Sequence, residues 1–288
     1  MSVIIDEKLI LSPPEDAQPI RHARILYRTI WRRYGATIEA SSERHGFPAS
    51  ALTNELTYEF WRPSLLPATW EVNAGESVTV DACGIASHTM GSDGNTVEVQ
   101  YFDGSDWETV GDFAPDNDDP ILFLFEPIEA RRWRIRVTGP NVPSIGVVFF
   151  GRALQMYRPI YQGHSPLALS RETVREPNRS ERGQWLGISV TRRGVGTDFS
   201  WDNLPALWYR DEFDPFAEYA SQGPGTFFIA WRPSQFPREV GYCWLDQDDI
   251  QPSNSGPRDL MSVSMSVRGQ IGFDLKRRIS RGGRDGVP

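Results

Sequence analysis

The stretch Val97-Glu98-Val99-Gln100-Tyr101-Phe102-Asp103-Gly104-Ser105-Asp106-Trp107 decides the fold. Apolar and polar residues alternate along its first half, which is typical of a strand with one buried face. Asp103-Gly104 suits the tight turn of a β-hairpin, and Trp107 then lies across from the alternating strand, where it covers one face. The stretch therefore predicts a β-hairpin backed by a tryptophan.

The same kind of pattern continues on both sides of this hairpin. Strands are predicted at residues 56–61, 69–72, 78–80, 84–89, 96–102, 107–110, 121–125, 132–138 and 145–150, and again at 185–190, 226–231, 240–245 and 260–267. Gly, Asp, Asn and Pro mark turns between them. Short strands at regular spacing indicate a sandwich or jelly roll. A short helix is expected at 213–219, and residues 21–34 fit either a helix or a strand.

Composition agrees with an all-β chain. The 10 Trp, 15 Phe and 9 Tyr, together with 22 Pro and 25 Gly, favour short strands joined by turns over long helices. A length of 288 residues allows two domains. We expect an N-terminal arm or assembly segment at 1–50, a β-sandwich at 51–157, a linker or long loop at 158–184, a second β-rich domain at 185–275, and a basic flexible tail at 276–288.

Charge and cysteine content narrow the function classes. The net charge of −8 disfavours a nucleic-acid binder. Apart from Lys8 and Lys276 the basic residues are all arginine, which suits planar interface contacts or reflects coding bias in the genome. Cys83 and Cys243 are expected as buried free thiols. No secretion signal and no membrane-spanning run is predicted, so we expect a protein kept in the cytoplasm or carried inside a particle.

One motif occurs twice. Trp61-Arg62-Pro63-Ser64 returns as Trp231-Arg232-Pro233-Ser234, and a further proline follows three residues later in each copy. We interpret Trp61 with Pro63, and Trp231 with Pro233, as structural corners at which proline stiffens the chain and tryptophan packs beneath it.

Residues 84–151 resemble the galactose-binding-like, or discoidin, jelly roll. The hairpin quoted above, the strand Arg132-Trp133-Arg134-Ile135-Arg136-Val137 and the apolar run 145–151 are similar to successive parts of that family. The resemblance implies a sugar site at loops on one end of the sandwich. A sugar offers an apolar face for stacking and hydroxyls for fixed polar groups. Candidate carbohydrate-binding residues are His88, Asp93, Trp107 and Arg134.

Each candidate also has a purely structural interpretation. Trp107 can be a purely structural residue of the hairpin. His88 can be a hydrogen-bonded histidine of the core or surface, and Arg134 can line an interface.

Most of residues 50–270 resembles a tail-tip or baseplate protein of a long-tailed bacteriophage. The segments that carry this resemblance are FWRPSLLPATW, GIASHTMGSDGNTVEVQYFDG, FFIAWRPSQFPREVGYCW and RDLMSVSMSVRG. It implies a virion location at the tail tip, a ring of identical copies, tail tube and hub proteins as neighbours, and a glycan-binding domain for host attachment. A stand-alone lectin-like module is the alternative.

No catalytic motif is present, and we predict a protein that is not an enzyme and needs no cofactor. The chain has no G-x-S-x-G, no H-E-x-x-H and no Walker loop. A cell-surface glycosidase stays open, since it needs only two carboxylates at the right separation. The acidic run with Asp112, Asp116, Asp118 and Asp119 is either a calcium loop or, as we expect, a solvated loop. The arginines at the C-terminal end suit docking on an acidic neighbour.

Overall fold

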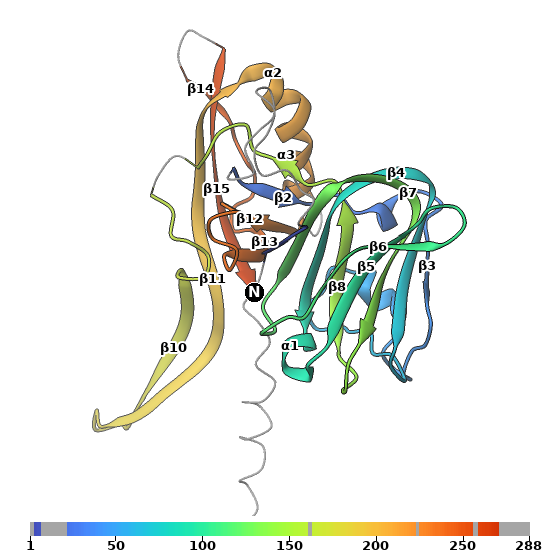
Figure 1. Ribbon diagram of the computed structural model, residues 1–288. Coiled ribbons are helices and arrows are strands. Elements are labelled where there is room, and N and C mark those ends of the chain that lie inside the picture. The colour runs from blue at the N-terminus through green and yellow to red at the C-terminus, as the bar shows by residue number, and fades with distance from the viewer. Residues whose placement is uncertain (1–2, 7–21, 161–162, 223–224, 256–258, 271–288) are drawn as a thin grey trace, which may run out of the picture.

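The chain folds into two β-sheets with a few short helices, as a computed structural model describes for residues 3–6, 22–160, 163–222, 225–255 and 259–270 (Figure 1). The first sheet holds β1 (Val3–Ile5), β3 (Thr37–Ala40), β4 (Ala68–His88), β5 (Thr96–Phe102), β6 (Trp107–Phe113), β7 (Ile121–Thr138) and β8 (Ile145–Gly151). The second holds β2 (Arg24–Leu26), β9 (Leu154–Gln155), β10 (Arg171–Arg179), β11 (Trp185–Pro205), β12 (Phe227–Ala230), β13 (Val240–Leu245), β14 (Ser253–Asn254) and β15 (Leu260–Gln270). The prediction of an all-β fold is confirmed.

The first sheet makes a sandwich by curling over on itself. β4 and β7 stay paired along their length, with register shifts between Asn73 and Val78 and between Val80 and Ala82. One half of this paired ribbon joins β3, β5 and β6, and the other half joins β1 and β8. The core between the two layers is aromatic, with Trp70 and Trp133 fully buried. Strands predicted separately at 69–72, 78–80 and 84–89 are therefore one bent strand.

The sequence of β7 changes its pattern where the strand changes layer. Ile121-Leu122-Phe123-Leu124-Phe125 is buried on both faces, whereas Arg132 to Val137 alternates half-buried arginines with buried apolar residues. A continuous apolar run is typical of a strand covered on both sides, and alternation is typical of a strand with one solvated face. β8 is likewise buried throughout.

The sandwich and the second sheet share a continuous apolar core. Leu122, Leu124 and Phe149 of the sandwich contact Phe228 and Tyr242 of the second sheet in one buried cluster. The close approach requires glycine at position 84, since a Cβ there would lie 2.6 Å from the ring of Phe228. A packed apolar contact of this kind fixes the two parts relative to each other.

The second sheet has helical cover on its far side and a long extension at one end. Phe213 and Phe216, around α3 (Asp214–Ser221), pack with Phe199, Trp201 and Phe227 in a separate buried cluster. β15 pairs with β11 only from Val195 onward, so β10 and the first half of β11 form a two-stranded arm that extends beyond the other strands (Figure 1). We call residues 171–190 the arm.

The chain reaches the sandwich from the second sheet and returns to it. β2 pairs with β12 and with β9, so residues 27–153, which hold all of the sandwich except β1, lie between two strands of the second sheet. The N-terminal segment thus contributes to both sheets: β1 and β3 to the first and β2 to the second.

Several local expectations change. Residues 56–60 form no strand, and Trp61 makes only an isolated bridge to Ile145. Glu55, just before this segment, adopts a left-handed conformation at φ 63°, which is incompatible with a strand at that residue. For residues 21–34, where helix and strand were both open, residues 22–34 hold the short strand β2 and one turn of 3-10 helix at Ile30–Arg32. The short helix near 213–219 is confirmed by α3.

Residues 158–184, expected as a linker or long loop, contain the strand β10. The basic tail at 276–288 lies outside the described residues.

Cys83 and Cys243 are both buried and free, as expected, and they lie in different cores. Burial raises the pKa of each thiol. No helix in the described part of the chain combines the length and apolar character needed to span a bilayer.

Candidate functional site

The outer face of the sandwich carries a row of three arginines. Arg132, Arg134 and Arg136 alternate along β7 with the buried Trp133, Ile135 and Val137, so all three arginine side chains leave the sheet on the solvent side. Alternation along a half-buried strand places them there without further cause. We call this surface, with its neighbours on β3, β4, β5 and β6, the polar face.

Each arginine is held by a polar residue of a neighbouring strand. Arg132 Nε donates to Glu71 Oε1 at 2.6 Å, Arg134 Nε to Gln100 Oε1 at 2.7 Å, and Arg136 Nη1 to Glu98 Oε1 at 2.5 Å. Gln100 is itself buried and donates to Glu98 and to Thr109 at 3.0 Å. The guanidinium groups are therefore fixed in orientation before any ligand arrives.

Trp107 lies among these arginines. The guanidinium carbon of Arg134 is 3.9 Å from the centre of the Trp107 ring, and that of Arg132 is 5.1 Å away. Phe102, directly opposite in the hairpin, contacts the ring edge at 5.5 Å between centroids. Burial lowers the pKa of Arg134, while the hydrogen bond to Glu71 raises that of Arg132. The structure thus brings together two of the four predicted residues, Trp107 and Arg134, and adds Arg132.

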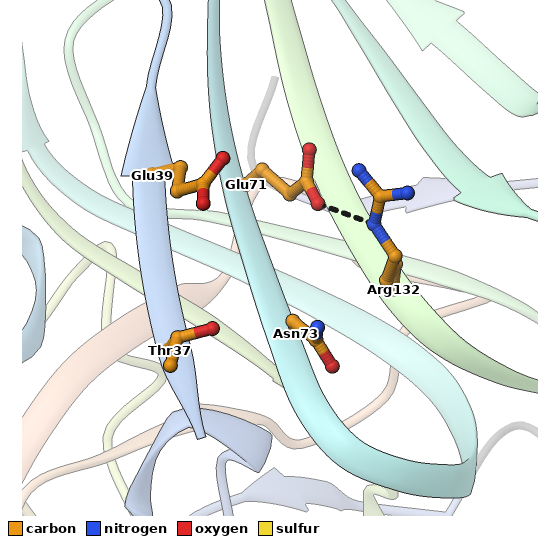
Figure 2. A pocket seen from close by; sticks show the side chains of 5 residues that line it. All are labelled: Thr37, Glu39, Glu71, Asn73 and Arg132. Carbon is orange, nitrogen blue, oxygen red and sulfur yellow. Dashed lines mark hydrogen bonds and ion pairs between the residues drawn. The ribbon is translucent and has the colours of Figure 1, made fainter. Parts of the chain in front are cut away.

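A small polar pocket of about 180 Å³ adjoins the row. Its lining comes from three adjacent strands: Thr37, Glu39, Glu71, Asn73 and Arg132 (Figure 2). Such a volume is below the 300–1,000 Å³ usual for small-molecule pockets, so it suits only one end of a ligand.

Two carboxylates meet in this pocket. Glu39 and Glu71 are directly opposite in the pairing of β3 with β4, and both side chains rise from the same face of the sheet (Figure 2). A glycosidase places its two carboxylates on either side of the scissile bond. Here they stand next to each other on neighbouring strands, and Glu71 is engaged with Arg132.

The other two predicted residues lie elsewhere. His88 ends β4 with no exposed surface, its Nε2 is 2.9 Å from the carbonyl oxygen of Asp119, and its Nδ1 accepts from the backbone N–H of Met90 at 3.3 Å. Asp93, in α1 (Met90–Asp93), accepts from Thr89 Oγ1 at 2.6 Å. His88 and Asp93 lie before the first residue of β5, whereas Trp107 pairs with its last residue, Phe102. The length of β5, about 20 Å, therefore separates His88 and Asp93 from Trp107.

The acidic loop is held by a hydrogen bond from α1 and by one within the loop. Asp118 accepts from the backbone N–H of Ser92 at 2.9 Å, and Asn117 accepts from that of Asp119 at 3.1 Å. Across the described ranges, no three His, Cys, Asp or Glu side chains gather in a way that could hold a metal ion.

The two repeated motifs sit in different cores. Trp61 is fully buried in the sandwich, and its Nε1 donates to the carbonyl oxygen of Ser42 at 3.0 Å; Pro63 follows it. Trp231 follows β12 in the second core and stacks on Phe236 at 5.1 Å; Pro233 lies in the turn that brings Phe236 back.

Glu71, Asn73 and Glu39 were not among the residues singled out from the sequence. A signal was available: Thr37-Ile38-Glu39-Ala40 and Trp70-Glu71-Val72-Asn73 alternate in the same way as β7. Alternation alone does not say which strands are neighbours, and that adjacency is what assembles the pocket.

No protein-family model matches the chain, and no curated protein matches it. Among solved structures, a Ruminococcus gnavus GH29 fucosidase in complex with fucose is similar with a TM-score of 0.40 and 15% identity over 45% of this chain. This chain covers 27% of that fucosidase, about a quarter of its length. The family 32 carbohydrate-binding module of C. perfringens NanJ, in complex with galactose, has a TM-score of 0.36 and 20% identity, covering 44% of this chain and 98% of the module.

A chitosan-binding module from a chitosanase/glucanase of Paenibacillus sp. IK-5 is similar with a TM-score of 0.37 and 21% identity, covering 43% of this chain and 99% of the module. Each of these similarities involves less than half of the chain, so none of them identifies what the chain does.

Proposed function

We propose that the chain binds glycans on the polar face, around Trp107, Arg132 and Arg134. The observation that carries the proposal is a half-buried aromatic ring set among oriented guanidinium groups on an open sheet surface. Sugars present apolar C–H patches to aromatic rings and hydroxyls to fixed donors and acceptors. The polar face offers both within one surface.

Donors and acceptors remain available on this surface. A guanidinium group has five N–H donors, and the hydrogen bonds from Arg132 and Arg134 to their strand neighbours use one each. Glu39 adds acceptors in the adjoining pocket, and Asn73 adds its amide N–H donors, since its amide oxygen already accepts from Gly75 and Arg131. Because the arginines are already held in place, little side-chain entropy is lost on binding.

The test is a glycan array with the intact chain, followed by titration of the best ligand against Trp107→Ala and Arg134→Gln. We expect each variant to weaken binding about tenfold, the loss of roughly one good contact. Trp185→Ala is the matched control, because Trp185 is exposed on the arm, away from the sandwich. Unchanged affinity in Trp107→Ala and Arg134→Gln, with folding intact by circular dichroism, would refute the site.

A second role, in assembly, is favoured by the arm. Ile188 and Val190 share one face of β11 by their spacing, and Leu186 lies beside them at a register shift between β10 and β11. All three are more than 40% exposed. A two-stranded hairpin is marginally stable alone in water, and exposed apolar stripes mark interaction sites. We propose that the arm is covered when the protein assembles.

The partner we propose is a second copy of the chain. β10 ends its sheet, and its outer edge carries the order Arg171-Glu172-Thr173-Val174-Arg175-Glu176. In an antiparallel pair of such strands, Arg171 can face Glu176 of the second copy while Glu172 faces Arg175 of that copy. Opposite charges across a strand pair are favourable, and an open strand edge is a template for pairing.

Size-exclusion chromatography with light scattering tests this second role. Leu186→Lys with Ile188→Lys should shift the protein to a monomer, while Leu207→Lys, which changes a still more exposed leucine outside the arm, should not. A wild-type chain that stays monomeric at high concentration contradicts the proposal.

The widest proposal combines both roles in a phage tail tip, where copies form a ring beside tube and hub proteins and display glycan-binding faces. The segments similar to tail proteins and the exposed arm support it. Mass spectrometry of purified virions tests it, and absence of the chain from the particles would end it.

A further inference from the structure

A cavity of about 510 Å³ lies where the sandwich meets the second sheet, away from the polar face. It is bounded by residues 27–30, 32 and 33, by the bend of β4 at residues 77–79, by Gly151 and Arg152 at the end of β8, and by Tyr219 of α3. The volume falls within the range of small-molecule pockets. None of the roles proposed above uses it.

Four arginines line this cavity in a chain that is acidic overall. Two of them are already paired: Arg32 with Glu55, and Arg33 with Glu76. Arg28 and Arg152 are exposed and form no ion pair with any residue that the structure describes. Arg28 lies over the Tyr27 ring and Arg152 interacts electrostatically with the buried Asp81, but neither guanidinium group is within ion-pair distance of a described carboxylate. Two such guanidinium groups on the rim of one cavity favour an anionic group between them.

The wall of the cavity contains a buried hydroxyl without a partner. Thr29 is 5% exposed, and its Oγ1 has no hydrogen bond within the described chain. A buried polar atom left unpaired costs free energy, which a ligand hydroxyl or carboxylate can recover. The hydroxyls of Ser77 and Thr79 lie on the same wall.

The remaining lining is aromatic and apolar. Tyr27 and Tyr219 contact each other with ring centroids 5.3 Å apart, and Ile30 and Val78 complete the wall. Such a combination of aromatic rings, hydroxyls and cations fits a hydroxylated ring that carries a charge.

We propose that this cavity binds an acidic saccharide unit, whose carboxylate or phosphate pairs with Arg28 and Arg152 and whose hydroxyl bonds to Thr29. The choice of a sugar rests on the proposed glycan-binding function, but the site shares no residue with the polar face. An experiment can therefore refute binding in this cavity without refuting glycan binding on the polar face, and the reverse.

Isothermal titration calorimetry on the full chain tests the proposal with four probes: N-acetylneuraminate, glucuronate, glucose 6-phosphate and galactose. We expect one or more of the three anions to bind, more weakly as salt rises, and galactose not to compete. The carboxylate and phosphate probes distinguish the two sources of the charge. If no anion binds, or if galactose binds this cavity as well as the anions do, the proposal is overturned.

Variants locate the site. Arg28→Gln and Arg152→Gln should each weaken anion binding about tenfold, and Arg182→Gln, which removes the same charge from the arm, should leave it unchanged. Thr29→Val should keep or raise the melting temperature of the free protein, because it removes an unpaired hydroxyl, and still weaken the ligand severalfold. Equal effects of Arg182→Gln and Arg28→Gln would mean non-specific attraction and refute the site. Trp107→Ala should not change anion binding.

Discussion

The hydroxyl of Tyr242 donates a hydrogen bond to the backbone carbonyl of Glu55 at 2.8 Å, which joins the second sheet to the sandwich. The same hydroxyl lies 2.9 Å from Thr226 Oγ1, and Thr226 donates to the Glu55 carboxylate at 2.7 Å. Arg32 pairs with the other carboxylate oxygen. Glu55 is 3% exposed, so this charge is buried with its partners around it.

Tyr242→Phe should lower the free energy of unfolding by about 2 kcal/mol, because it removes the hydroxyl and leaves the Glu55 carbonyl without that donor. Urea denaturation followed by tryptophan fluorescence measures the change. Tyr34→Phe is the control, since Tyr34 is fully exposed. If both variants unfold at the same urea concentration as the wild type, this hydrogen bond does not stabilise the fold.

Gly84→Ala should destabilise the contact between the two parts of the molecule by about 2 kcal/mol or more, the usual range for overpacking a tight core. The added methyl group would meet the Phe228 ring, which is enclosed by Phe149 and Tyr242. The double variant Gly84→Ala with Phe228→Leu should lose less stability than the two single changes added together. Additive losses would show that the two positions do not meet.

The free energy of unfolding should fall in acid, because His88 becomes protonated more readily in the unfolded state than in the folded state. Burial lowers the pKa of His88 to about 4, so the folded state resists protonation that the unfolded state, with an ordinary pKa near 6.5, accepts. The contribution is complete above about pH 6.5 and falls as pH drops toward 4, where about 3 kcal/mol is lost.

Chemical denaturation at several pH values should therefore show a shallower slope between pH 6.5 and 4 in His88→Gln than in the wild type. His45→Gln changes an exposed histidine and should leave the slope as it is. Identical slopes in all three proteins would contradict the assignment.

Cys83 and Cys243 should react with iodoacetamide only after unfolding. Both thiols are fully buried, and burial raises their pKa, so the reactive thiolate is scarce in the folded protein. Mass spectrometry should show no labelling in buffer at pH 8 and double labelling in denaturant. Fast labelling of either residue in buffer would mean that its core opens readily.

Much of the fold follows from local pattern, as the strand Thr96–Phe102 and the doubly buried run at β8 illustrate. Patterns of this kind state which residues are buried but not what buries them. The apolar residues 147 and 149 could not reveal that a second sheet, with Leu26, Phe228 and Tyr242, covers that side. The bend of β4 was also hidden, because two short strands and one curled strand give the same alternation.

The candidate site shows the same division. Trp107 and Arg134 were identified from the hairpin and its neighbour, and the structure puts them in contact. His88 follows a strand as a surface ligand would, yet its ring is enclosed through contacts with the distant Asp119. Arg28 and Arg152 are more than a hundred positions apart, and only the return of the chain to the second sheet brings them to one cavity.

The shared apolar core between sandwich and second sheet has a consequence for binding strength. The apolar contact fixes the polar face to the second sheet, and the arm is an extension of that same sheet (Figure 1). Copies joined through their arms would hold their faces at a set spacing. Several weak binding sites engaged at once on a repetitive surface would then give an avidity many times higher than the affinity of one site.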